Sequence, residues 1–243
     1  MEEIKFALDT FYAIMSGALV MWMAAGFTML EAGLVQKKDV SEIVTKNLGL
    51  FSIACVMYLV CGFALMYPAD AIFAIAGGLD EAGEAVSYGI LPAIATSWGL
   101  SADLPLEEIG MAYGMDYSQQ ADFFFQVVFV ATAMSIVSGA VAGRMKLIPF
   151  FIFTVILTAF IYPVQGYWNW GGGFLSVLGY SDYAGSGTVH LLGAAAALGV
   201  VTLLGARNGK YGADGSINPM PGSNIPLAAL GVLILWLGWF GFN

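Results

Sequence analysis

The sequence predicts an all-α, polytopic membrane protein, and two observations lead to this fold class. Hydrophobic residues make up 59% of the 243 residues, charged residues only 10%, and the mean hydropathy is +0.81. Soluble domains carry about 25% charged residues, so this composition excludes an ordinary soluble protein. The second observation is a series of apolar runs, most of them close to the length of about 20 residues that crosses a bilayer as a helix.

The expected membrane spans are 11–35, 48–67, 123–141, 147–164, 188–204 and a last one that runs from 225 to 243. This last run is still apolar at Asn243, where the sequence stops. Because a chain does not normally end inside the bilayer, we expect residues 1–243 to be part of one membrane domain, truncated in its sixth helix. Five complete spans reverse the topology of a chain, which suits the first half of an inverted repeat.

Basic residues fall in alternate connections between these spans. They are Lys37, Lys38 and Lys46 in the first connection, Arg144 and Lys146 in the third, and Arg207 and Lys210 in the fifth. Lysine and arginine favour cytoplasmic loops, and only Lys5 falls on the opposite side. We therefore expect a multi-pass protein of the cell inner membrane with its N-terminus outside.

The connection over residues 68–122 carries nine acidic residues and no basic residue. Such a face would concentrate cations near the outer surface, although a loop made soluble by its acids is the simpler interpretation. Two short apolar stretches within it, 71–78 and 88–98, are candidates for interfacial or re-entrant helices. Basic residues are nowhere clustered enough to bind nucleic acid.

His190 is the only histidine, and it lies in an almost wholly apolar run that is expected to span the membrane. An ionisable group inside a membrane span is costly, so it indicates a functional site. Desolvation disfavours the charged form of an imidazole, and a neutral imidazole donates from one nitrogen and accepts at the other. This suits a small polar solute that passes a dry constriction. The structural alternative is a histidine bonded to a neighbouring helix.

Asp182, Trp168 and Trp170 precede the expected fifth span. An acid at this position can accept backbone N–H groups and cap the helix, or it can bind a cation directly. The tryptophans can belong to an interfacial aromatic belt, or they can form a cation–π site. Phe125 and Phe129 open the third span at a spacing of i, i+4, so they share one helix face and can line a pore instead of packing against lipid.

Other chemistry is weakly indicated. The pair Ser186 and His190 has a spacing that permits a contact, as in an intramembrane hydrolase, but neither an oxyanion element nor a group that orients the histidine can be named. The triple glycine at 171–173 lacks the lysine and serine or threonine of a phosphate loop. Cys55 and Cys61 point to different helix faces, which favours buried thiols over a disulfide. We expect no catalytic residue, no metal site and no cofactor.

At these residues the chain resembles the ammonium transporter (Amt/Mep/Rh) family. The matching segments are YWNWGGGFL, DYAGSGTVHLLGAAAALG, LWLGWFGFN and, near the start, MLEAGLVQKKDV followed by KN. The resemblance runs through essentially the whole chain in order. It implies two five-helix halves of opposite orientation plus a last helix, assembled as a homotrimer with one pore in each subunit. This chain then supplies the first half and part of the sixth helix.

The resemblance also implies roles for individual residues. Phe129 and Trp170 match the outer recruitment site, and Asp182 matches the acid beside it. Phe125, Phe129 and Phe242 match the phenylalanine gate, and His190 matches the first histidine of the pore pair. The second histidine and the recruitment serine are expected beyond Asn243. Many members read Ala-Glu-Arg where this chain has Gly143 before Arg144, a difference that bears on regulation at the cytoplasmic side.

The implied function is ammonium transport. An ammonium ion is recruited by cation–π contacts and loses its proton, and ammonia then passes along a histidine-lined pore. One alternative is an ammonium sensor, the receptor domain of a signalling protein; a remote alternative is the intramembrane hydrolase. The expected partners are ammonium or ammonia as substrate, the lipid bilayer, two further copies of the chain, and a cytosolic regulatory or signalling protein.

Overall fold

The computed structural model describes residues 2–67 and 117–243. The acidic connection and its two short apolar stretches lie almost wholly outside these residues. The described chain is built of helices, apart from one isolated bridge between Tyr211 and Ile217. Five helical segments in it are long and apolar enough to cross a membrane.

The first two segments form a helical hairpin. Helix α1 spans Glu2–Leu34, a short 3₁₀ turn (η1) covers Lys37–Asp39, and α2 spans Val40–Met57. This second helix continues through a π-helical turn, η2 (Tyr58–Gly62), into α3 (Phe63–Met66). Lys46 therefore lies on α2 and not in the connection, so its assignment to the first loop was wrong.

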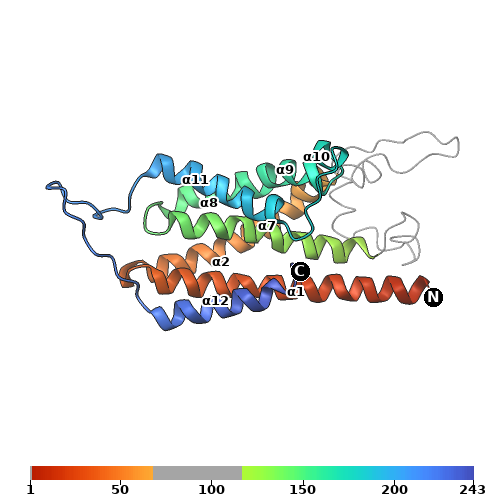
Figure 1. The fold of residues 1–243 in the computed structure, drawn as a ribbon, viewed down its shortest axis with the longest axis horizontal. Helices are drawn as coiled ribbons and strands as arrows, with labels where there is room; N and C mark the ends of the chain where they lie inside the picture. The colour runs from red at the N-terminus through yellow and green to blue at the C-terminus, as the bar shows by residue number, and fades with distance from the viewer. Residues whose placement is uncertain (1, 68–116) are drawn as a thin grey trace.

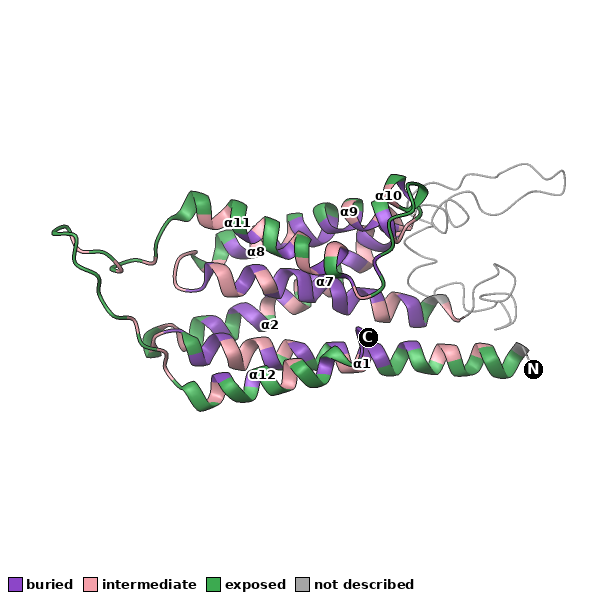
Figure 2. Ribbon diagram, viewed as in Figure 1, coloured by how far each residue is buried: buried purple, intermediate pink, exposed green. Residues whose placement is uncertain are grey.

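Helix α7 (Gln119–Val141) is the central helix of the bundle. The Ser118 hydroxyl caps it by accepting the Ala121 N–H at 3.1 Å. It packs against α1, α2 and α11 and is largely buried along its length, as the purple ribbon in Figure 2 shows. The next segment is continuous and consists of α8 (Leu147–Ile156), η4 (Leu157–Ile161) and α9 (Tyr162–Asn169), followed by the short α10 (Phe174–Val177).

The last helices begin at two different kinds of N-terminus. A π-helical turn, η5 (Ser186–Leu191), leads into α11 (Leu192–Leu204), whereas α12 (Ile225–Trp239) is capped by the side chain of Asn224. Helix α12 lies alongside α1 (Figure 1). It ends at Trp239, where hydrogen bonds from Gly241 to Gly238 and from Phe242 to Trp239 turn the chain, so the run that is apolar to Asn243 is not one unbroken helix.

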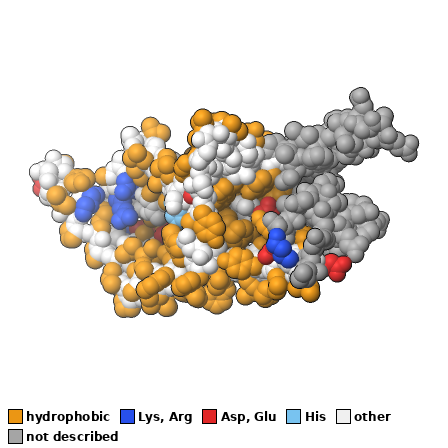
Figure 3. Space-filling view, turned by 45° about the vertical axis from the view of Figure 1, so that its right-hand side comes forward, with side chains coloured by type: hydrophobic (Ala, Val, Ile, Leu, Met, Phe, Trp, Pro, Cys, Tyr) orange, Lys and Arg blue, Asp and Glu red, His pale blue; other side chains and the backbone are white. Residues whose placement is uncertain are grey.

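The two ends of the bundle differ in charge. The connections α1–α2, α7–α8 and α11–α12 all lie at the left of Figure 1, and they carry most of the described lysine and arginine residues. Figure 3 shows basic side chains toward the left end of a largely apolar surface, and basic and acidic side chains next to each other near the right end. We call the end that holds these three connections the basic end. The opposite end holds the beginnings of α7 and η5.

A buried ion pair lies where α1, α2 and α7 meet. The Lys46 ammonium is 3.3 Å from Glu31 Oε2, and both side chains are at most 5% exposed. Lys46 also donates to the Ser138 carbonyl at 2.8 Å, and the Ser138 hydroxyl donates to Glu31 Oε2 at 2.8 Å. The Phe150 ring lies 5.2 Å from the same ammonium. Three helices are thus joined by charges that are paired inside the protein.

Small residues allow α7 and α11 to approach closely. A Cβ atom added to Gly193 would lie 2.8 Å from the Ala133 carbonyl oxygen and 3.0 Å from Ile136 Cβ. Such contacts are closer than side chains tolerate, so this position needs glycine. The packing holds η5, which precedes α11, against α7.

Candidate functional site

A cavity opens at the end of the bundle opposite the basic end, and we call it the vestibule. Together with its opening it encloses about 940 Å³ of empty space. Its walls come from α7, the end of α9, the segment before η5 and the end of the chain; the lining residues are Tyr67, Tyr117, Asp122, Phe125, Gln126, Phe129, Trp170, Tyr183, Ala184 and Phe242. Four of the residues expected at a recruitment site and gate are therefore brought together.

The aromatic rings in the vestibule contact one another in series. The ring centroids of Phe129 and Trp170 are 6.0 Å apart, those of Phe125 and Phe129 are 4.6 Å apart, and those of Phe129 and Phe242 are also 4.6 Å apart. Phe129 is the shared member, and its side chain is buried. The negative faces of aromatic rings attract cations, so these rings form a surface that a small cation can contact.

Trp170 and Trp168 lie in different environments. The Trp170 indole N–H donates to the Asp182 carbonyl at 2.7 Å, which fixes the ring at the wall of the vestibule. Trp168 is 39% exposed and packs against Phe174 outside the cavity. The belt interpretation therefore suits Trp168, whereas Trp170 belongs to the vestibule.

The carboxylate of Asp182 is occupied by the backbone. Its oxygens accept the N–H groups of Ser186 at 2.8 Å, Gly187 at 2.9 Å and Thr188 at 2.7 Å. These are the free N–H groups at the start of η5, so Asp182 caps this helical segment. The geometry favours the capping interpretation, and Asp182 is not among the residues that line the vestibule.

His190 lies beneath the vestibule and contacts its floor. The imidazole centroid is 5.3 Å from Phe242 and 4.9 Å from Trp239. Nδ1 is 3.2 Å from the carbonyl oxygen of Gly185, the residue at φ +72° that opens η5. A tautomer protonated at Nδ1 donates this bond and leaves Nε2 as an acceptor. The aromatic series thus continues from Trp170 to the imidazole.

Two polar residues of the vestibule, Asp122 and Gln126, were not predicted as site residues. Asp122 Oδ1 accepts from Tyr117 Oη and from Gln126 Nε2, both at 3.4 Å. Gln126 Oε1 is buried and has no hydrogen-bond partner among the residues that the structure describes. The signal for both was present in the sequence, because Asp122 and Gln126 are i, i+4 neighbours on α7 and flank Phe125.

The hydrolase interpretation gains no support from the geometry. The Nδ1 atom of His190 contacts Gly185 and not Ser186, whose side chain is exposed. Within residues 2–67 and 117–243, no group of three or more histidine, cysteine or acidic residues could hold a metal ion. Cys55 and Cys61 are free thiols.

Comparison with known proteins agrees with this architecture. The family model described as the Ammonium Transporter Family matches residues 11–243. The chain belongs to the ammonium transporter family. Ammonium transporter Amt2 of Archaeoglobus fulgidus is 40% identical over 252 residues, and Amt2 of Methanocaldococcus jannaschii is 36% identical over 238 residues.

The chain spans about half the length of these relatives. All of it aligns with 48% of the A. fulgidus protein, and 98% of it aligns with 50% of the M. jannaschii protein. Among solved structures, a protein described as a sensor Amt protein matches with a TM-score of 0.78 and 33% identity, covering the whole chain and 55% of that protein. Mep2 of Candida albicans matches over the whole chain and 49% of its own, with a TM-score of 0.70 and 23% identity. The fold is that of the ammonium transporter family.

Proposed function

We propose that this chain forms the first half of a pathway for ammonium across the membrane. The single observation that carries the proposal is the continuous series of ring contacts from Trp170 through Phe129 and Phe242 to His190. Family membership supports the substrate, since the named relatives are ammonium transporters. Because those relatives are named as transporters, a transport role is the one to test first, before an enzymatic or a sensory role.

In this proposal Trp170 and Phe129 hold the ammonium ion at the vestibule by cation–π contacts, and Asp122 adds negative charge nearby. Asp182 acts indirectly, because it orients Trp170 and η5. Transfer of an ion into a low-dielectric interior costs on the order of 20 kcal/mol in the idealised case, and neutral ammonia avoids most of this cost. The proton therefore leaves near the gate of Phe125, Phe129 and Phe242, and ammonia passes His190.

We further propose that the protein acts as a homotrimer in the cell inner membrane with the basic end in the cytoplasm. The positive charge of the connections supports this orientation, because lysine and arginine favour the cytoplasmic side. It puts the N-terminus and the vestibule outside, where ammonium arrives. A cytosolic regulatory partner would then meet the basic end.

Reconstitution of the full-length protein in proteoliposomes tests the function. External ammonium should produce a saturable current or an ammonia flux. The variant Phe129→Leu should weaken it, and Phe124→Leu, an α7 neighbour that does not line the vestibule, should leave it near the wild-type level. Absence of both current and flux from intact wild-type oligomers would contradict the proposal.

A further inference from the structure

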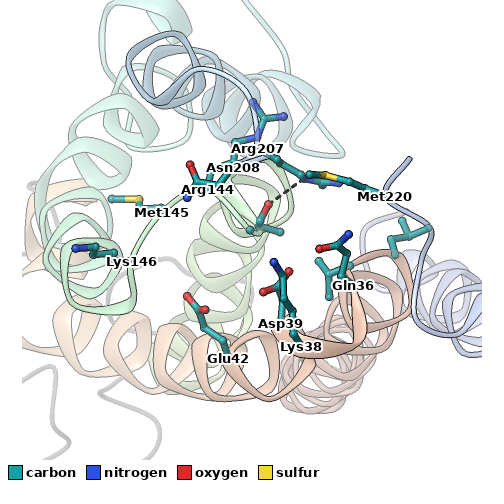
Figure 4. Close-up of a pocket in the computed structure, with 14 residues that line it drawn as sticks. Gln36, Lys38, Asp39, Glu42, Arg144, Met145, Lys146, Arg207, Asn208 and Met220 are labelled. Carbon is teal, nitrogen blue, oxygen red and sulfur yellow. Dashed lines mark hydrogen bonds between the residues drawn. The ribbon is translucent and has the colours of Figure 1, made fainter. Parts of the chain in front are cut away.

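A second cavity lies at the basic end, on the opposite side of the bundle from the vestibule (Figure 4). It is lined by the α1–α2 connection with the start of α2, the α7–α8 connection and the chain after α11, and it shares no lining residue with the vestibule. Together with its opening it encloses about 740 Å³ of empty space. Nothing in the transport proposal uses this cavity.

The cavity lining is cationic. Its charged residues are Lys38, Arg144, Lys146 and Arg207 against Asp39 and Glu42. In the part of the chain that the structure describes, the four cations form no ion pair, unlike the buried pair of Lys46 and Glu31. Basic side chains that line a polar cavity without forming ion pairs favour an anionic ligand.

The two arginines are held in place by the backbone. Arg144 Nη1 donates to the Gly205 carbonyl at 2.8 Å, and Arg207 Nε donates to the Ala142 carbonyl at 3.1 Å. Arg144, which follows α7, thus binds a carbonyl just after α11. Arg207, which follows α11, binds a carbonyl just after α7. A guanidinium has five N–H groups, and Arg144 Nε is buried without a hydrogen-bond partner within residues 2–67 and 117–243. The orientation of both guanidinium groups is therefore fixed while several donors remain unused.

We propose that this cavity binds a phosphate ester. Fixed guanidinium groups match the tetrahedral arrangement of phosphate oxygens, and Lys38 and Lys146 add positive charge. Asp39, at the end of η1, and Glu42, in the first turn of α2, lie across the cavity from the two arginines (Figure 4). They suit hydroxyl or ammonium groups on the rest of the ester. The ester is either a soluble organophosphate or the headgroup of a phospholipid.

Titration of the full-length protein separates the two sources. In nanodiscs of neutral phosphatidylcholine, glycerol 3-phosphate is added and the heat of binding is measured. Saturable binding identifies a soluble ester. Retention of phosphatidic acid over phosphatidylcholine in native mass spectrometry, without binding of glycerol 3-phosphate, identifies a lipid headgroup. Absence of both overturns the proposal.

Two matched pairs of variants test the location. Lys38→Gln should weaken binding, and Lys37→Gln should not, because both lysines are exposed but only Lys38 lines the cavity. Gly143 has φ +66°, and an added Cβ would lie 3.7 Å from Asp39 Oδ2 and 3.9 Å from Arg207 Cδ. Asparagine and aspartate both tolerate this backbone region.

The variant Gly143→Asp adds a carboxylate beside Arg207, so its binding should be about tenfold weaker than that of Gly143→Asn. Neither pair removes the backbone hydrogen bonds of the arginines, and thermal unfolding reports whether each variant is folded. Equal binding within both pairs overturns the proposal. It stands or falls independently of ammonium transport.

Discussion

The vestibule and the ion pair where α1, α2 and α7 meet use buried polar groups differently. Among the described residues, Gln126 Oε1 in the vestibule wall has no hydrogen-bond partner, and the contact of His190 with Gly185 beneath it uses only one ring nitrogen. At the ion pair, Lys46 and Glu31 neutralise each other and both bind Ser138, and only Glu31 Oε1 is left without a partner in the described chain. Neutral polar groups beside a cavity suit a visiting ligand, whereas paired charges suit the fixing of helices.

The largest effect is expected at the ion pair. The variant Lys46→Met leaves the Glu31 carboxylate buried without its cation, which should lower the free energy of unfolding by about 3–5 kcal/mol. Thermal unfolding in detergent would measure it. The double variant Glu31→Gln with Lys46→Met should recover much of the loss, because no buried charge remains. An unchanged single variant would show that the pair does not stabilise the helix contacts.

A smaller loss is expected at the cap of η5. The variant Asp182→Ala removes the acceptor of three backbone N–H groups, and replacing a capping aspartate by alanine costs about 0.5–2 kcal/mol. Stability and ammonium transport should fall together. Asp182→Asn keeps an acceptor oxygen and should restore part of both. If Asp182→Ala is stable but inactive, the carboxylate acts on the cation directly and the vestibule must be redrawn to include it.

Between the two regions, the contact of α11 with α7 allows a matched comparison. Gly193→Ala places a methyl group against the Ala133 carbonyl and Ile136, and such overpacking costs about 1–3 kcal/mol. Gly199→Ala, on the same helix, meets no atom within 4 Å and should be neutral or slightly stabilising. Unfolding midpoints of the two variants would compare them. Equal midpoints would contradict the close approach.

The smallest free-energy change is expected in the vestibule. The variant Trp170→Leu removes a cation–π contact of about 0.5–2 kcal/mol, which corresponds to a rise of about 2- to 30-fold in the ammonium concentration for half-maximal flux. Its stability should change little. Trp168→Leu should leave the flux unchanged, because that ring lies outside the cavity. If Trp168→Leu raised the half-maximal ammonium concentration and Trp170→Leu did not, the ion would be bound at Trp168, outside the vestibule.

The helical spans could be predicted from composition and length, because a bilayer demands about 20 apolar residues whatever the neighbours are. The position of Lys46 could not. A lysine just before an apolar run is typical of the edge of a loop. Lys46 can be buried because it pairs with Glu31, which lies on another helix. Local patterns do not reveal pairings made by tertiary packing.

The same limit applies to the candidate site. The spacing of Phe125 and Phe129, the isolation of His190 and the tryptophans before the expected fifth span pointed to the candidate site. Motif resemblance selected Trp170 over Trp168 and added Phe242. The turn after Trp239, which brings Phe242 against Phe129, depends on packing of Gly241 close to the Ser16 carbonyl on α1. Gln126 was missed because its only signal is the i, i+4 spacing from Asp122, which does not show by itself that the amide faces a cavity.

Asp182 holds two neighbours by different atoms. Its carbonyl accepts the Trp170 indole, and its carboxylate gathers the backbone from which His190 projects four residues later. One residue therefore fixes both the Trp170 ring at the vestibule wall and the start of the helical segment that carries His190. Loss of the Asp182 side chain would remove the second attachment and spare the first, because the indole binds the backbone carbonyl.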